Sequence, residues 1–234
     1  MTEDADKGAQ APTGLAKLDR DCIRTRVRKL LLSRIIDGAY PSGFHLKELS
    51  LASEFRVSQA PVREALRELE TMGLVVTEPY RGSRVRGIDL EELLEAYELR
   101  ATMESRAVEL AMLAAGGPLP ESVCAELSAS LELMRSAVSV ADKDLHIQSA
   151  FAFHRKLIEC CGNRVFLRTW DGFHWDLRAT VLLRSREVGV ESLLQVVQCH
   201  EALLGRLHEG DMAGARVAVR TAFDNFVALF RAGS

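Results

Sequence analysis

The chain contains few aromatic residues and no apolar segment long enough to cross a membrane. Phe, Trp and Tyr make up 6% of its 234 residues, and no apolar run reaches the length of about 18 residues that a membrane helix needs. The first fourteen residues are polar and acidic, so they lack the apolar core of a secretory signal. These absences predict a cytoplasmic protein that has no membrane partner.

Cysteine is scarce and follows no recognisable pattern. The five cysteines are an odd number, and no two of them have the CxxC spacing of a metal or redox motif. Reduced thiols in the cytoplasm are therefore expected. Leu, Ala, Arg and Glu are abundant instead, which favours helices over sheet.

Charge is distributed unevenly along the chain. The formal net charge is −3, but residues 15–88 carry 14 Lys and Arg against 9 Asp and Glu, whereas residues 89–234 carry 15 against 21. The resulting charges of +5 and −6 indicate a domain suited to a polyanion followed by a domain that is not.

Local patterns divide the chain further. Residues 1–14 have no periodicity and are expected to form a disordered tail. Residues 15–88 show three helical segments, the third beginning at Ser58 and ending at Gly73, and then two short strands around the turn Pro79–Gly82. Three helices followed by a β-hairpin wing predict a winged helix-turn-helix domain.

Residues 89–234 show no strand pattern. Glycine-containing breaks separate amphipathic segments, which predict an antiparallel all-α bundle and hence a mainly α protein. The expected helices, about six in number, span roughly 89–115, 120–139, 142–161, 163–187, 189–209 and 211–231.

The third helix of the first domain has a polar face. Gln59, Arg63 and Arg67 recur every four residues, so they share the side that meets base edges when such a helix enters the major groove. An arginine there can bridge guanine O6 and N7, and a glutamine can pair with adenine. The alternative is a solvated helix of a protein–protein module, with Glu64 and Glu68 pairing with the arginines. The candidate DNA contacts are Ser58, Gln59, Arg63 and Arg67 on this helix, and Arg81, Gly82 and Arg84 in the wing.

These residues also carry a resemblance. The stretch Ile36–Gly43, the segment Pro61–Arg67 and Arg81–Gly82 in the wing resemble the GntR family of bacterial transcriptional regulators. The family usually has Arg and Thr where this chain has Gln59 and Ala60. The resemblance implies DNA binding. Because these two residues differ, it does not imply that this chain recognises the operator sequence of another member.

The second domain extends the resemblance. Tyr97, Arg100, Glu104 and the helical remainder are similar to the FadR-type subfamily, which has an FCD effector-binding domain. This similarity implies a homodimer on a pseudopalindromic double-stranded DNA operator, usually a repressor that a small-molecule effector releases. It also implies that the protein is not an enzyme.

The resemblance includes a metal motif that is incomplete here. FCD domains usually have an Asp four residues before a His, and two more His about twenty-two residues apart. In this chain the four positions are Ala150, His154, His200 and Ala222. Zinc normally takes about three or four protein ligands, so no cofactor is predicted unless a nearby cysteine supplies a further ligand. The two alanines should enlarge the cavity and suit an organic ligand.

Several polar residues lie among the apolar positions of the bundle. Arginines such as Arg100 and Arg178 can anchor a carboxylate through bidentate contacts, which indicates an organic acid as effector. The alternative is structural: Arg100 paired with Glu104, Arg178 paired with Asp171, and histidines satisfied in the core. The candidate effector contacts are Arg100, His154, Asp171, His174, Arg178 and His200.

Two other classes of function stay open at this point. One is an enzyme built on the helical bundle, although no Ser/His/Asp arrangement or nucleotide-binding loop supports it. The other is an adaptor that uses the winged helix to bind a protein. Salt-dependent binding to duplex DNA would distinguish a regulator from both.

Overall fold

The computed structural model describes residues 13–87, 89–184 and 188–231. The chain forms two compact units that divide between Gly87 and Ile88. The expected disordered tail, residues 1–14, lies outside the described residues except for its last two, which begin the first helix. None of the described helices combines the length and the apolar character that a membrane span requires.

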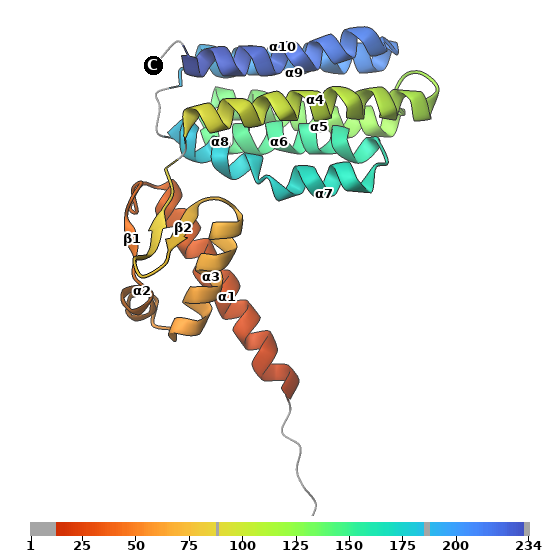
Figure 1. The fold of residues 1–234 in the computed structure, drawn as a ribbon. Helices are drawn as coiled ribbons and strands as arrows, with labels where there is room; N and C mark the ends of the chain where they lie inside the picture. Colours follow the sequence, from red (N-terminus) through yellow and green to blue (C-terminus); the bar gives the residue numbers. More distant parts are fainter. Residues whose placement is uncertain (1–12, 88, 185–187, 232–234) are drawn as a thin grey trace, which may run out of the picture. The chain divides into compact units, whose positions relative to one another are not determined.

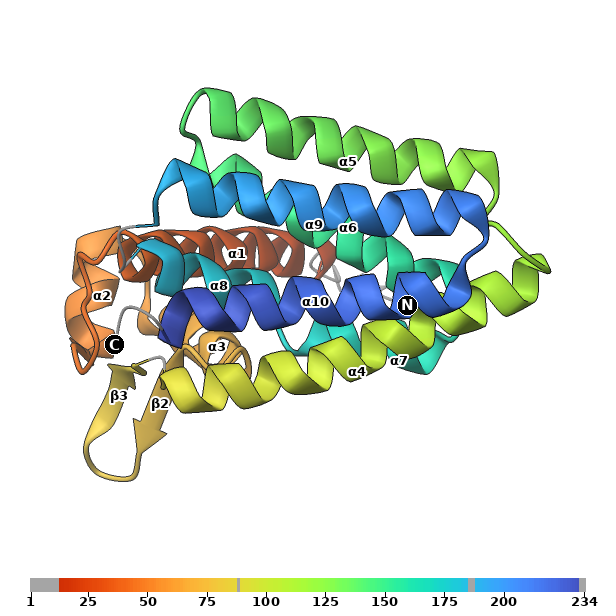
Figure 2. The same cartoon turned by 90° about the horizontal axis from the view of Figure 1, so that it is seen from above.

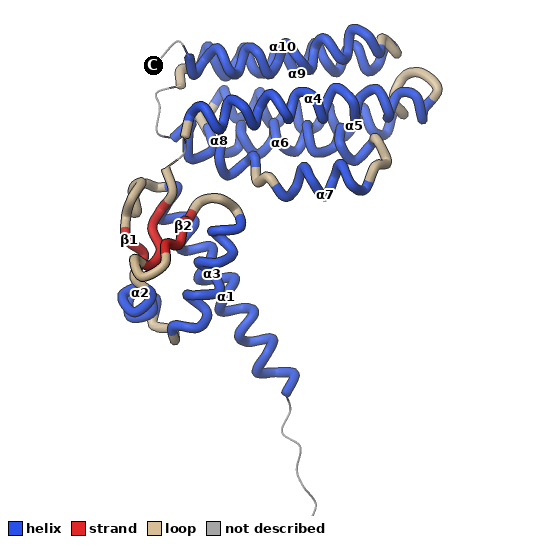
Figure 3. Tube along the Cα trace, viewed as in Figure 1, coloured by secondary structure: helices blue, strands red, loops and turns tan. Residues whose placement is uncertain are grey.

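The first unit is a three-helix domain with a small sheet (Figures 1 and 3). Its helices are α1 (Thr13–Ile36), α2 (Glu48–Phe55) and α3 (Gln59–Thr71). The apolar side of α3 faces α1: Leu66 and Leu69 are buried, as are Val27 and Leu31 of α1. Because the apolar residues of α3 occupy one side only, its polar side is left for solvent or a ligand.

The sheet has one strand more than the sequence predicted. Strands β2 (Val75–Glu78) and β3 (Gly82–Val85) form the expected antiparallel hairpin, and β1 (His45–Leu46) pairs with the other edge of β3. The strand order is β1-β3-β2. A strand of two residues has no alternating pattern that a sequence could display, so only the hairpin was predictable.

The second unit is the expected antiparallel bundle. Its central helix, α6, packs against α4, α5, α7 and α8. In Figure 2, α5, α9, α10 and α4 lie side by side in that order, in agreement with their contacts. The helices are α4 (Leu90–Ala115), α5 (Glu121–Ser139), α6 (Lys143–Cys160), α7 (Arg164–Gly172), α8 (Trp175–Arg184), α9 (Val190–Glu209) and α10 (Met212–Arg231).

One predicted helix was wrong. The segment 163–187 is divided into α7 and α8, because His174 adopts a left-handed backbone conformation with φ +48°. A residue with this φ cannot continue a right-handed helix. The regular spacing that would have placed Asp171, His174 and Arg178 on one stripe therefore does not exist. Residues 185–187 lie outside the described part of the chain.

Candidate functional site

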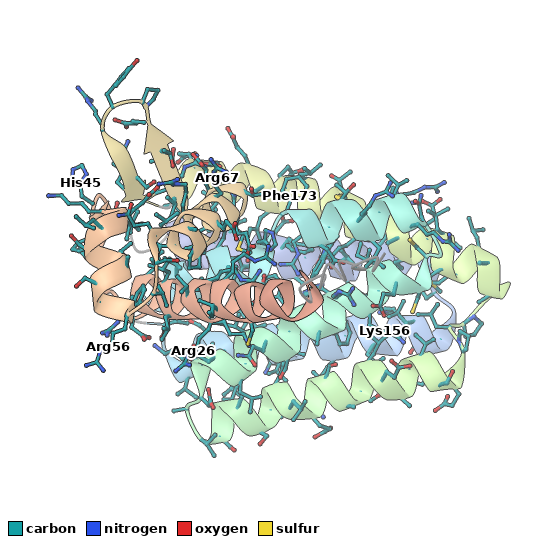
Figure 4. All side chains as sticks on the ribbon, turned by 90° about the horizontal axis from the view of Figure 1, so that it is seen from below. Arg26, His45, Arg56, Arg67, Lys156 and Phe173 are labelled. Carbon is teal, nitrogen blue, oxygen red and sulfur yellow. The ribbon has the colours of Figure 1, made fainter. Side chains whose placement is uncertain are left out.

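The polar side of α3 exposes to solvent the residues predicted to contact DNA bases. Gln59, Arg63 and Arg67 are all exposed, whereas Val62 and Leu66 on the opposite side are buried. Figure 4 labels Arg67 on this helix. The three side chains therefore share a face that can approach a ligand without disturbing the core.

The helix begins at a serine that leaves its first turn uncapped. Ser58 occupies the N-cap position with an extended backbone, and its side chain makes no capping hydrogen bond. The first N–H groups of a helix attract anions when no side chain satisfies them. This end of α3 is therefore suited to a phosphate.

Arg63 is held by a carboxylate that sequence reasoning missed. Its Nε donates to Glu48 Oε1 at 3.0 Å, and its Nη2 donates to Glu48 Oε2 at 2.7 Å. These hydrogen bonds raise the pKa of Arg63 above its ordinary value. Glu48 is the first residue of α2, so the pair connects the two helices. Because the contact uses the Nε–Nη2 edge of the guanidinium, Nη1 and the other N–H of Nη2 can still face a base.

Glu68, one of the two acidic residues of α3 that could have paired with Arg63 or Arg67, is engaged by the core helix instead. Glu68 pairs with Arg24 and Arg28 of α1, at 3.1 and 2.8 Å, and so joins α3 to the core helix. In the wing, Glu78 contacts Arg84 at 2.8 Å and Arg81 at 3.5 Å. Hydrogen bonds and charge from Arg84 lower the pKa of Glu78.

The wing tip is shaped by left-handed backbone conformations. Gly82 has φ +79° and Tyr80 has φ +64°, with the tyrosine ring fully exposed. Nothing lies within 4 Å of the Cβ position at Gly82, so the tip is open to a close approach by another backbone. Arg81 directly precedes Gly82, and Arg84 lies two residues after it.

A cavity lies inside the second unit. It has a volume of about 70 Å³ and is lined by residues of α4, α6, α8, α9 and α10. Three of the predicted effector contacts line it together: Arg100, His154 and His200. Ala150 and Ala222 also line it, so the two positions that lack a metal-ligating side chain face the cavity as expected.

A buried carboxylate contacts two of the polar side chains that line this cavity. Glu104, with no exposed side-chain surface, accepts from Arg100 Nε at 2.7 Å and from Trp170 Nε1 at 3.3 Å. Its other oxygen contacts Nδ1 of His154. Burial opposes ionisation of Glu104, but the charges and hydrogen bonds of His154 and Arg100 outweigh it and lower its pKa to about 2. The sequence indicated only the pairing of Glu104 with Arg100.

The two imidazoles meet through their Nε2 atoms, which are 3.1 Å apart. The Nδ1 of His200 donates to the carbonyl of Val196 at 2.7 Å. Burial, together with the charge of His154, lowers the pKa of His200 to about 3. Among the described residues, no three metal-ligating side chains are gathered in one place. Two imidazoles without a third protein donor do not fit a resident zinc ion.

The other three predicted effector contacts lie outside the cavity. Asp171 is paired with Arg155, whose Nε is 2.9 Å from its Oδ1, and lies with His174 in a separate open depression. Arg178 contacts Glu92 at 3.4 Å rather than Asp171. The break between α7 and α8 accounts for this separation.

Two sequence profiles match the chain. The profile described as bacterial regulatory proteins, gntR family, matches residues 23–85, and the profile of the FCD domain matches residues 95–225. The chain belongs to the GntR family. It is a DNA-binding transcriptional regulator whose FCD domain is a ligand-binding effector domain. The family and these relatives are regulators of transcription, not enzymes.

Individual GntR relatives cover most of the chain. A probable D-xylose utilization operon transcriptional repressor of Paenarthrobacter nicotinovorans is 27% identical over 195 residues, which are 83% of each chain. The repressor GlaR of Escherichia coli is 30% identical over 81% of this chain and 87% of its own. A putative GntR regulator from Rhodococcus sp. RHA1 has the same fold, with a TM-score of 0.72 at 22% identity over 90% of this chain and 98% of that one.

Glu48→Gln is expected to weaken sequence discrimination by roughly threefold to tenfold, because Arg63 loses the charged partner that orients it. Binding to random duplex should strengthen at the same time, since a negative charge beside the phosphates is removed. A gel-shift titration against specific and random DNA measures both quantities. Glu209→Gln, an exposed substitution in the second unit, is the matched control. An unchanged ratio of the two affinities would show that Glu48 does not position Arg63.

Ala150→Asp combined with Ala222→His is expected to create a tight zinc site. The double substitution restores the two missing donors around His154 and His200, which gives the four ligands that zinc prefers. We expect close to one zinc per chain after dialysis, measured by elemental analysis, and no retained zinc in the unmodified chain. Stoichiometric zinc in the unmodified chain would contradict the reading of an incomplete site.

Proposed function

We propose that this regulator is a homodimeric repressor that binds a pseudopalindromic operator and is released by a small organic acid. In this proposal, residues 15–88 contact DNA and residues 89–234 bind the effector and form the dimer. The named relatives are repressors. Its place of action is the cytoplasm, where the DNA of a bacterial cell lies.

One observation supports the DNA-binding part of the proposal. The exposed face of α3 presents Gln59, Arg63 and Arg67, with a free helix end at Ser58. The guanidinium of Arg63 is held at one edge and is open at the other, which suits bidentate contact to a guanine. We assign Ser58 and the wing residues Arg81, Gly82 and Arg84 to phosphate and groove contacts.

The buried cluster supports the effector half. Arg100, His154 and His200 line one cavity together, and we assign them to the effector. Asp171, His174 and Arg178 lie elsewhere, so we leave them out of the site. An effector releases DNA only if its affinity differs between the DNA-bound and the released arrangement. Helix α4 carries Arg100 and follows the wing in the chain. We therefore assign to α4 the transmission of effector binding to the DNA-binding domain.

The test is binding to duplex DNA from the region upstream of the protein's own gene. Affinity should fall steeply between about 50 and 200 mM salt, and a sequence preference should survive excess random competitor. Sedimentation of the complex should give two chains per operator. Folded protein that shows no preference for any duplex, or that binds as a single chain, would overturn the corresponding part of the proposal.

A further inference from the structure

Four residues other than glycine have a left-handed backbone in the part of the chain that the structure describes. They are Arg56, Tyr80, Ala141 and His174. A side chain disfavours this conformation, because its Cβ comes too close to the following carbonyl oxygen. Strained residues of this kind gather at functional sites, so each of them calls for a physical reason. Arg56 is the only one of the four with a permanent positive charge.

The fold requires the backbone conformation of Arg56 but not its side chain. Arg56 has φ +54° and ψ +48° at the C-cap of α2, where its N–H donates to the carbonyl oxygens of Ala52 and Ser53. Every residue except proline supplies such an N–H, and glycine supplies it in this conformation without the steric cost. The turn between α2 and α3 would therefore be more stable with glycine at position 56.

The side chain of Arg56 is exposed and has no hydrogen bond, ion pair or ring contact with the described residues. Figure 4 shows it at the end of α2, extending away from the ribbon. The two carboxylates of α2 are engaged by other residues: Glu48 contacts Arg63 at 2.7 Å, and Glu54 accepts from the hydroxyl of Tyr40 at 2.8 Å. The positive charge of Arg56 is therefore not compensated by its own helix.

The position of Arg56 places this charge beside the helix that contacts DNA. Arg56 lies two residues before Ser58, so their Cα atoms are at most about 7 Å apart. When the first turns of such a helix face the base edges, the residue that precedes it lies near the phosphates bordering the groove. The planar guanidinium of an arginine binds a phosphate through two parallel hydrogen bonds.

We propose that Arg56 binds a phosphate of the operator at the border of the groove that α3 enters. The proposal rests on the DNA-binding function proposed above and adds a residue to the contacts assigned there. A phosphate contact carries no sequence information, so Arg56 contributes affinity and holds the position of α3 in the groove. The strained backbone lowers the stability of the free protein, and the DNA contact offsets this loss in the complex.

Arg56→Gly is expected to change folding and DNA binding in opposite directions. Amide hydrogen exchange of the buried part of α3, measured by mass spectrometry on the full chain, should slow by about twofold to fivefold, because the strain is relieved. Affinity for specific and for random duplex should fall by the same factor, about threefold to tenfold per bound chain. The slope of log affinity against log salt should fall by about one per bound chain, as for one lost phosphate contact.

Two variants control for charge and for position. Arg56→Lys keeps the charge and the backbone strain, so the salt slope and the exchange rate should stay as they are in the unmodified chain. Arg168→Ala removes an exposed arginine from α7 in the second unit and should leave DNA binding unchanged. Fluorescence anisotropy titrations at several salt concentrations measure the affinity of each variant for both duplexes.

Three results would overturn the proposal. The first is a folded Arg56→Gly protein that binds both duplexes as the unmodified chain does. The second is a loss of affinity for the specific duplex alone, because Arg56 would then contact a base. The third is faster exchange of α3 in Arg56→Gly, because the side chain would then support the fold.

The unmodified chain serves as the reference in every titration. If it is folded and binds no duplex, the function proposed above is wrong, and the role of Arg56 is wrong with it. If it binds duplex DNA and Arg56→Gly binds equally well, only the role of Arg56 is wrong. The failure of one proposal is therefore distinguishable from the failure of the other.

Discussion

Glu104→Ala is expected to destabilise the second unit by about 3–5 kcal/mol, the cost of removing one partner from a buried ion pair. The carboxylate has no exposed surface and accepts hydrogen bonds from Arg100 and Trp170. Its removal leaves the guanidinium of Arg100 buried without a counter-charge. His154 also loses the partner of its Nδ1.

Urea unfolding followed by circular dichroism measures this change. For a unit of this size, the loss corresponds to a fall in the melting temperature of roughly 10 °C. Glu98→Ala is the control, because Glu98 lies on the same helix in an exposed pair with Arg220, and its midpoint should not move. Glu104→Gln, which keeps the shape but not the charge, should fall between the two. Equal midpoints for Glu104→Ala and Glu98→Ala would show that the buried cluster contributes nothing to stability.

Arg63→Ala is expected to weaken specific operator binding by about ten- to hundredfold. The side chain is exposed and the carboxylate that it contacts, Glu48, is partly exposed, so the domain should keep its fold. Affinity for random duplex should fall much less. Binding to random duplex depends on many positive charges that contact phosphates, whereas Arg63 is assigned to a base.

Competition gel-shifts with specific and random DNA separate the two effects. Arg206→Ala, an exposed arginine in the second unit, is the control for the loss of one positive charge. Circular dichroism verifies that both variants are folded. If folded Arg63→Ala protein keeps the sequence preference of the unmodified chain, α3 does not read the operator through this residue.

The architecture of the first unit was predictable because its signals are local. The apolar positions of α3, such as Val62 and Leu69, recur at helical spacing, and Gly82 marks the hairpin tip. Strand β1 was missed because it is defined only by its pairing with β3. The Glu48–Arg63 pair was missed for the same reason, since it joins residues fifteen positions apart on different helices.

The site in the second unit was only partly predictable. The resemblance to FCD domains indicated that His154 and His200 line the cavity, and the structural alternative included the pairing of Arg100 with Glu104. Nothing local shows that His154 contacts the second oxygen of Glu104, because that contact is made through packing. The left-handed residue His174 is likewise invisible to a pattern of apolar residues, so the prediction of one continuous helix was wrong.

The alanines at positions 150 and 222 have a consequence for physiology. A sensor whose ligand is held through a bound metal fails when cells are starved of that metal, because its affinity depends on metal supply. This chain has methyl groups at both positions, and its cavity relies on Arg100 for positive charge. Its response is therefore expected to follow metabolite concentration alone, in zinc-poor and zinc-rich growth media alike.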